Sequence, residues 1–104
     1  MDKVFRALAD PGRRRLLDLL FEKDGQTLGE LSGQMDMTRQ AVAQHVAILE
    51  GANLMSTVRN GRERLLYLNP VPIQDISDRW IHKYARRHMQ ALSRLKARSE
   101  SRDG

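Results

Sequence analysis

The sequence predicts a mainly α-helical domain with one small β-hairpin, an α+β fold with the element order α-α-α-α-β-β-α. Apolar residues recur at helical spacing in four short segments before residue 53 and in one long segment after residue 72. Between these segments, two extended runs flank Asn60-Gly61, which favours a hairpin because both residues tolerate the positive φ of a type I′ turn. A chain of 104 residues has room for one hydrophobic core, so we expect a single domain.

The first two helices meet where Asp10 precedes Pro11. Val4, Phe5 and Leu8 place an apolar face on the first helix. Asp10 suits the N-cap of the second helix, and proline suits its first position, where the missing N–H costs nothing. We expect the second helix at the centre of the core because most of its surface is apolar. Its apolar residues are Leu16, Leu17, Leu19, Leu20 and Phe21.

A third helix begins with a capping-box pattern. Thr27 and Glu30 are three residues apart, so each side chain can accept a hydrogen bond from the other's backbone N–H. The residues that we expect to face inward are Leu28, Leu31 and Met35. Asp36 follows where the chain turns. We expect it in the left-handed conformation, which Asp adopts more readily than most residues that have a Cβ.

The fourth helix begins after Thr38, which can cap it, and ends before Asn53, which we expect in the left-handed position usually held by Gly. Its apolar side consists of Val42, Val46 and Leu49. Its opposite side is small and polar, and consists of Arg39, Gln40, Ala43, Gln44 and Ala47. Two short helices joined by a tight turn form a helix-turn-helix, and with the hairpin as its wing the domain is a winged helix-turn-helix.

The predicted strands of the wing are Met55–Arg59 and Arg62–Leu68. Asn69-Pro70-Val71-Pro72 then interrupts regular structure, and one long helix covers residues 73–98 approximately. The apolar stripe of this helix is Ile73, Ile76, Trp80, Tyr84, Ala91, Leu92 and Leu95. We therefore expect one winged-helix domain over residues 1–98 and a disordered polar tail over residues 99–104.

Composition limits the possible functions. The net charge of +5 and the pI of about 10.2 favour a polyanionic partner such as nucleic acid. The absence of cysteine excludes disulfides and thiolate metal sites. There is no signal-peptide pattern and no apolar run long enough to span a bilayer, so we expect a cytoplasmic protein that does not contact membranes. The sequence contains no nucleophile elbow, no phosphate-cradling Gly-rich loop and no zinc-protease motif, so we expect neither enzyme activity nor a cofactor.

The polar side of the fourth helix is the predicted reader of double-stranded DNA. A helix-turn-helix inserts its second helix into the major groove, and the first turns of that helix reach the base edges. Arg39 can pair with guanine, whereas Gln40 and Gln44 can pair with adenine. Thr38, at the helix N-terminus, is better placed for a phosphate. The alternative is a merely solvated helix face, which we consider weaker because a turn and a wing flank this helix.

Each of the other basic groups has two interpretations. Arg59, Arg62 and Arg64 flank the hairpin tip, where they either contact DNA or keep an exposed hairpin from aggregating, and we favour DNA contact. His45 either reaches a phosphate or forms a hydrogen bond within the fold. The run Arg13-Arg14-Arg15 diverges around a helix, so either one of its residues touches a phosphate or all three form a solvated basic turn.

The stripe on the last helix predicts a homodimer. Trp80 and Tyr84 are four residues apart, and a chain this short cannot cover the whole stripe, so a second copy of the helix is the natural partner. The alternative is that the stripe packs against the protein's own first helix, which would cover part of the stripe and need not exclude a dimer. Asp78 and His82 share a helical face, and a two-fold axis would gather four such ligands. A surface ion pair is the commoner outcome, and we expect no metal site.

Four motifs follow one another along nearly the whole chain. They are Leu8-Ala9-Asp10-Pro11-Gly12-Arg13-Arg14, then Leu28-Gly29-Glu30-Leu31, then Thr38-Arg39-Gln40-Ala41-Val42-Ala43-Gln44-His45-Val46 with Leu49, then Asn60-Gly61-Arg62 with Tyr67-Leu68-Asn69-Pro70. In this order and spacing they resemble the ArsR family of winged-helix transcriptional repressors. Asp36 and Asn53 stand where that family commonly has Gly.

The resemblance implies a homodimer that is formed through the first and last helices, binds an inverted-repeat operator and blocks transcription. The interface residues that it implies are Val4, Phe5, Ile76, Trp80, Tyr84 and Leu92. Many family members release DNA when metal binds to cysteines or to an Asp and His set on the last helix, but this chain lacks both patterns. It looks more like the metal-independent branch, whose members are often paired with START-like ligand-binding proteins.

Two alternatives stay open at this point. One is a metal-responsive repressor that uses Asp78 and His82 at the dimer interface. The other is a winged-helix module that binds a protein instead of DNA. The operator, and the effector or partner protein that regulates binding, are not specified by these residues.

Overall fold

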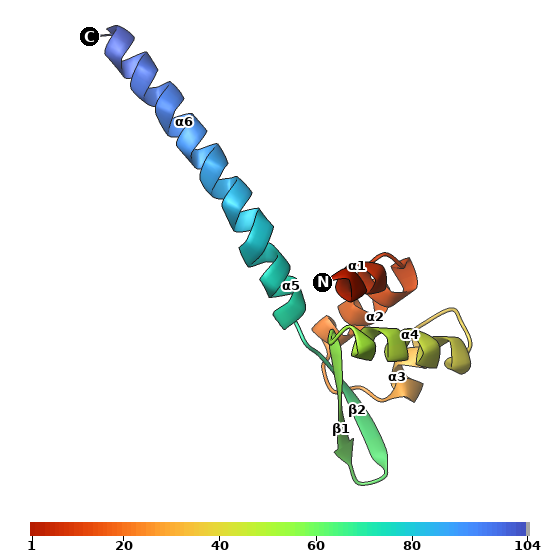
Figure 1. Ribbon diagram of the computed structural model, residues 1–104. Coiled ribbons are helices and arrows are strands. Elements are labelled where there is room, and N and C mark those ends of the chain that lie inside the picture. Colours follow the sequence, from red (N-terminus) through yellow and green to blue (C-terminus); the bar gives the residue numbers. More distant parts are fainter. Residues whose placement is uncertain (104) are drawn as a thin grey trace. The chain divides into compact units, whose positions relative to one another are not determined.

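The computed structural model describes the backbone of residues 1–103 and the side chains of residues 1–98. The predicted tail, residues 99–104, lies outside the fully described residues. The elements in Figure 1 are α1 (Asp2–Leu8), α2 (Pro11–Glu22), α3 (Leu28–Gly33), α4 (Arg39–Gly51), β1 (Met55–Asn60), β2 (Glu63–Leu68), α5 (Val71–Ile76), the π-helix η1 (Ser77–Ile81) and α6 (His82–Asp103). The predicted mainly helical winged helix-turn-helix is confirmed. The backbone forms two compact units, of which the first is Met1–Ile73 and the second begins at Gln74.

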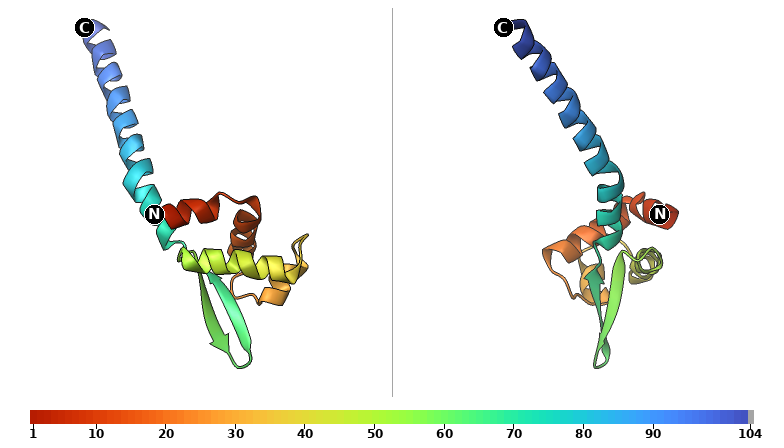
Figure 2. Two further views of the ribbon diagram at one scale, coloured as in Figure 1. Left: turned by 45° about the vertical axis from the view of Figure 1, so that its right-hand side comes forward. Right: turned by 60° about the vertical axis from the view of Figure 1, so that its left-hand side comes forward.

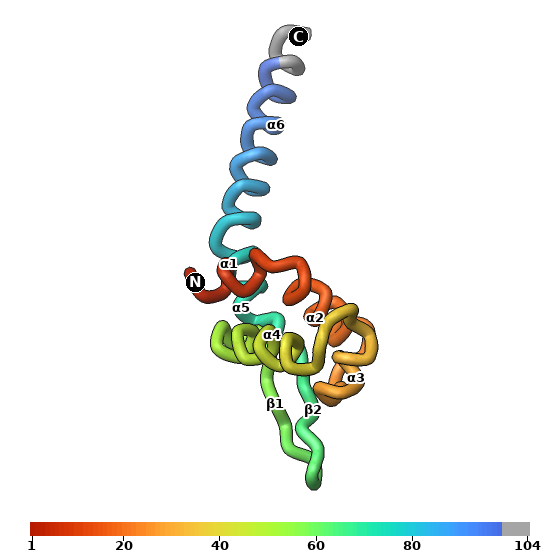
Figure 3. The backbone as a smooth tube through the Cα atoms, turned by 90° about the vertical axis from the view of Figure 1, so that its right-hand side faces the viewer, coloured from red at the N-terminus to blue at the C-terminus, as the bar shows by residue number. Residues whose placement is uncertain are grey.

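The core of the first unit lies between α1, α2, α3, α4 and the base of the hairpin. Figure 3 shows these helices clustered together, with the hairpin leaving from the end of α4. The largest fully buried side chains are Leu16, Leu20, Leu31, Val42, Leu49 and Leu54. The expectation that Phe21 joins this core is wrong, because its side chain is 81% exposed. It lies about 140° around the helix axis from Leu16, outside the buried face.

The predicted helix caps are confirmed. Asp10, Thr27 and Thr38 each accept a hydrogen bond from the backbone N–H three residues later, at 3.0, 3.1 and 3.1 Å. Asn53 has a φ of 61° after the end of α4, as expected for a left-handed C′ residue. The expectation for Asp36 is wrong, because Asn53 is the one described residue other than glycine with a positive φ. The chain leaves α3 through Gln34 in the right-handed region instead.

The wing is an antiparallel pair whose register runs from Met55 opposite Leu68 to Asn60 opposite Glu63. The loop is therefore Gly61-Arg62, one residue later than predicted, because Asn60 is used by strand pairing. Gly61 has a φ of 66°, whereas Asn60 and Arg62 do not have positive φ values. A positive φ at the first central residue alone is typical of a type II′ turn, so the predicted type I′ turn is wrong. Figure 2 shows that the turn projects away from α1–α4.

A buried amide joins the helices to the wing. The side chain of Gln26 is in the core, with only 3% of the residue exposed. Its Nε2 donates to the carbonyls of Leu19 and Lys23, at 3.0 and 2.7 Å, where α2 ends. Its Oε1 accepts a hydrogen bond of 2.7 Å from Nε2 of Gln34, just after α3. One side chain therefore fixes the ends of two helices.

The backbone of the same residue binds the wing. The carbonyl of Gln26 accepts a hydrogen bond of 2.7 Å from the N–H of Leu66 in β2, and the N–H of Gly25 donates to the carbonyl of Leu66 at 3.0 Å. Gly25 has a φ of 73°, and an added Cβ would lie 3.0 Å from the hydroxyl oxygen of Tyr67. A larger residue is therefore strained at position 25. The short segment before α3 joins β2 through a single antiparallel bridge between Gln26 and Leu66.

We predict that Gln26→Leu lowers the free energy of unfolding by about 2 kcal/mol, because the carbonyl of Lys23 and the amide of Gln34 lose a hydrogen-bond partner inside the fold. The measurement is urea denaturation followed by circular dichroism. Gln90→Leu, at an exposed position of α6, is the matched control and should change stability by less than about 0.5 kcal/mol. Equal midpoints for the two variants would show that the amide does not hold these elements together.

Candidate nucleic-acid interface

Helix α4 presents a polar face to solvent. Val42, Val46 and Leu49 are buried against the rest of the unit, as predicted. Gln40 and Gln44 are exposed and lie one turn apart on the opposite side. Arg39 is exposed beside them, while Ala43 is half-buried and Ala47 is exposed. The small alanines leave the backbone of α4 accessible between the long polar side chains.

One face of the wing continues this surface. Thr57 lies opposite Leu66, and two residues further along, on the same face, Arg59 lies opposite Arg64. Leu66 is buried, and the Thr57 hydroxyl donates a hydrogen bond of 3.0 Å to Oε1 of Glu50 on α4. This face of the wing therefore adjoins α4. Its outer part carries two like charges directly opposite each other, an arrangement that destabilises a hairpin in isolation.

A hollow brings Arg39 of α4 together with the wing. The residues that line it are Thr27, Leu28, Gly29, Arg39, Arg62, Glu63 and Arg64. The sequence predicts DNA contact for all three of these arginines, at a base for Arg39 and at the hairpin tip for Arg62 and Arg64, whereas Glu63 is not among the predicted site residues. The only signal in the sequence was the position of Glu63 between two of the arginines. Convergence of residues 39 and 62–64 depends on how the wing packs, and no local pattern predicts it.

The contacts of His45 favour a hydrogen bond within the fold over contact with a phosphate. Its Nδ1 lies 3.4 Å from Nη1 of Arg13 and 4.0 Å from Oδ2 of Asp10, so its partners lie within the fold. The hydrogen bond from the backbone N–H of Arg13, helped by the charge of that guanidinium group, lowers the pKa of the Asp10 carboxyl below its usual range. His45 therefore connects α4 to the turn between α1 and α2.

Two residues of the basic run hold α1 in place. Arg13 donates from Nε to the carbonyl of Ala7 at 2.8 Å and from Nη2 to the carbonyl of Arg6 at 3.0 Å. Arg14 donates from Nη1 to the carbonyl of Leu8 at 2.7 Å. These carbonyls belong to the last turn of α1, where the helix leaves acceptors without partners, and of the three only that of Arg6 also accepts a backbone N–H, from Ala9 at 3.3 Å. Arg13 and Arg14 thus cap a helix, while Arg15 is exposed on α2.

The predicted interface residues are distributed over both units. Val4 is buried in the core of the first unit, whereas Phe5 is exposed. Ile76 and Trp80 are half-buried, and the π-helix that contains Trp80 interrupts the uniform spacing expected of one long α-helix. The guanidinium carbon of Arg79 lies 5.8 Å from the centre of a Trp80 ring. Tyr84 and Leu92 are exposed on α6.

The pair on the last helix is a surface contact. Nε2 of His82 lies 3.6 Å from Oδ1 of Asp78, which also accepts a hydrogen bond of 2.9 Å from Nε2 of Gln74. Within residues 1–98, no group of three or more His, Cys, Asp or Glu side chains gathers as a metal site would require. Across the described part of the chain, no helix combines the length and apolar character needed to cross a membrane.

Comparison with known proteins agrees with this geometry. Residues 8–58 match the family model described as "Helix-turn-helix domain". The chain is 38% identical over 86 residues to the uncharacterised HTH-type transcriptional regulator YuzN of Bacillus subtilis, covering 77% of this chain and 94% of that protein. It is 35% identical over 75 residues to the transcriptional repressor SdpR of the same organism, covering 72% of this chain and 82% of that protein.

A solved structure extends the likeness to nearly the whole fold. The ArsR-like transcriptional regulator from Rhodococcus sp. RHA1 superposes with a TM-score of 0.74 and 27% identity, covering 96% of this chain and 90% of that one. The crystal structure of another ArsR family transcriptional regulator gives a TM-score of 0.70 and 28% identity, with 82% and 86% covered. The chain therefore belongs to the ArsR family of helix-turn-helix transcriptional regulators and, as the sequence predicts, is not an enzyme.

Proposed function

We propose that the protein is a homodimeric repressor that binds an inverted-repeat operator. Each subunit places α4 in one of two successive major grooves, about 34 Å apart. The observation that carries the proposal is the continuous surface formed by the polar face of α4 and the cationic face of the wing. Repression, rather than activation, is supported by the likeness to SdpR, which is a transcriptional repressor.

The roles of individual residues follow from their places on this surface. Gln40 and Gln44 are the base readers, because a glutamine amide can bond the N6 and N7 atoms of adenine at once. The sequence-based proposal adds Arg39 to these readers, but its place beside the wing arginines favours another role. Arg59, Arg62 and Arg64 contact the DNA backbone. Thr38 keeps a hydroxyl proton for a phosphate while its oxygen caps α4.

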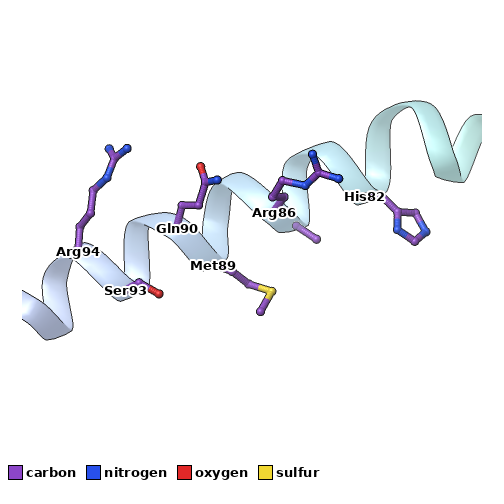
Figure 4. A pocket seen from close by; sticks show the side chains of 7 residues that line it. His82, Arg86, Met89, Gln90, Ser93 and Arg94 are labelled. Carbon is purple, nitrogen blue, oxygen red and sulfur yellow. The ribbon is translucent and has the colours of Figure 1, made fainter.

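The homodimer is supported by apolar side chains on α6 that the helix cannot cover by itself. Those that are more than half exposed and share one side of the helix are Tyr84, Leu92 and Leu95, and Ile81 at the end of η1 is equally exposed just before them. Figure 4 shows a more polar side of the same helix, with His82, Arg86, Gln90, Ser93 and Arg94 around Met89. An amphipathic helix with this division buries its apolar side against a partner. A second copy of α6 fits, because a two-fold axis pairs identical apolar stripes.

Selection of genomic fragments on the purified protein tests the proposal as a whole. Fragments are bound, washed at rising salt and sequenced. We expect one enriched inverted repeat whose half-sites are spaced by about one turn of DNA. Retention of fragments without any shared sequence would contradict operator recognition, and a protein that retains no DNA would favour a module that binds proteins instead.

We predict that Gln44→Ala removes discrimination at one base pair of each half-site, by about 1–3 kcal/mol, because it deletes a bidentate contact to a base. The measurement is a competition binding assay on operators with single substitutions. Arg62→Ala should instead weaken binding to operator and random duplex by the same factor, since a phosphate contact carries no sequence information. Equal loss on both duplexes for Gln44→Ala would remove it from the base readers.

We predict that Tyr84→Glu converts the dimer into monomers and abolishes operator binding, because it buries a carboxylate in the apolar seam. Ser93→Glu is the matched control. It adds the same charge to the same helix, about 180° around the axis from Tyr84, and should leave the dimer intact. Light scattering gives the mass of each variant. A Tyr84→Glu protein that remains folded and dimeric would show that the seam lies elsewhere.

A further inference from the structure

The hollow between α4 and the wing is a candidate anion site. Its volume is about 420 Å³, and three arginines from two parts of the chain far apart in the sequence line it. They are Arg39 in the first turn of α4 and Arg62 and Arg64 at the wing tip. Thr27, Leu28 and Gly29 form the remaining wall. The space is larger than a bare phosphate ion and can also take the sugars on either side of a phosphodiester.

Among the side chains of residues 1–98, the charged groups around this hollow form no ion pairs. The ion pairs among the described side chains join Lys23 to Glu30, and two histidines to aspartates, and none of them includes Arg39, Arg62 or Arg64. Glu63 shares the hollow, yet it forms no ion pair within 4.0 Å either. Arg59 stands opposite Arg64 and adds a further like charge at the edge. Cations gathered in this way repel each other unless an anion lies between them.

We propose that Arg39, Arg62 and Arg64 bind a single backbone phosphate of DNA and so connect α4 to the wing. The proposal rests on the proposed function and assigns one site within it. A guanidinium group presents N–H donors in a planar fork that matches two oxygens of a phosphate, and three such groups can surround the same anion. The site takes a phosphodiester and gives Arg39 a role in the clamp in place of base reading.

The clamp would fix how α4 enters the groove. A phosphate held from both sides sets the distance between the first turn of α4 and the wing tip, beyond the hydrogen bonds that already fix the base of the wing. Glu63 opposes the anion, so it limits the affinity of the site for anions in general. The clamp therefore contributes to register on the duplex without reading any base.

The test compares Arg39→Gln, Arg64→Gln and the double variant with the wild type, on the selected operator and on random duplex, over a series of salt concentrations. Each single variant should bind both duplexes about tenfold more weakly. The double variant should lose far less than the hundredfold expected of independent contacts, because both residues serve one phosphate. The slope of log affinity against log salt should fall by about 0.9 in all three.

Two controls bracket this result. Glu63→Gln removes the opposing charge from the hollow and should strengthen binding to both duplexes. Arg87→Gln removes an exposed arginine from α6, in the other unit, and should leave both affinities within twofold of the wild type. All of these changes are at exposed positions, so the variants are expected to fold.

Operators carrying one neutral methylphosphonate at a time locate the phosphate. In the wild type, one position in each half-site should weaken binding about tenfold, and that penalty should vanish in Arg39→Gln. The clamp is wrong if Arg39→Gln alters the preference for one base pair while the methylphosphonate pattern stays unchanged. It is also wrong if the losses from the two arginines multiply. If the wild type itself prefers no sequence, operator recognition fails instead, and the combined loss in the double variant still tests the clamp on random duplex, because that comparison needs no fixed register.

Discussion

The buried side chain of Gln26 is the interaction on which the geometry of the DNA-facing surface depends. Its amide bonds the end of α2 and the residue after α3, while its backbone carbonyl bonds Leu66 of the wing. The burial of leucines has no preferred direction, whereas a buried amide has few orientations in which all its hydrogen bonds are made. The helix-turn-helix and the wing therefore keep one relative position.

Helix α4 is held at two further points, and both leave its polar face free. Near its middle, His45 contacts Arg13 and Asp10 at the turn between α1 and α2. Near its end, Glu50 accepts the hydroxyl of Thr57 at the base of the wing. The polar contacts that support α4 therefore do not involve the face that carries Gln40 and Gln44. Gln40 and Gln44 need no role within the fold, and the wing arginines are likewise available for an anion.

Local physics made most of the fold predictable from the sequence. Caps at Asp10, Thr27 and Thr38, and the positive φ of Asn53, depend on neighbouring residues only, and all are confirmed. The local expectation of a left-handed Asp36 is wrong, and the other errors arose where long-range packing decides. Strand pairing moved the wing turn to Gly61-Arg62, and the unpredicted π-helix changed the spacing around Trp80. Three features could not be predicted because each joins segments that are distant in the sequence. They are the hydrogen bonds of Gln26, the capping of α1 by Arg13, and the convergence of Arg39 with the wing.

Amide hydrogen exchange at Leu66 tests most directly whether Gln26 fixes the wing to the helices. The N–H of Leu66 donates to the carbonyl of Gln26, and that of Leu54, in the core beyond α4, donates to the carbonyl of Leu49. If the wing is part of the cooperative core, both amides exchange at the same slow rate, set by global unfolding. Exchange at Leu66 several orders of magnitude faster than at Leu54 would show that the wing opens by itself and contradict this account.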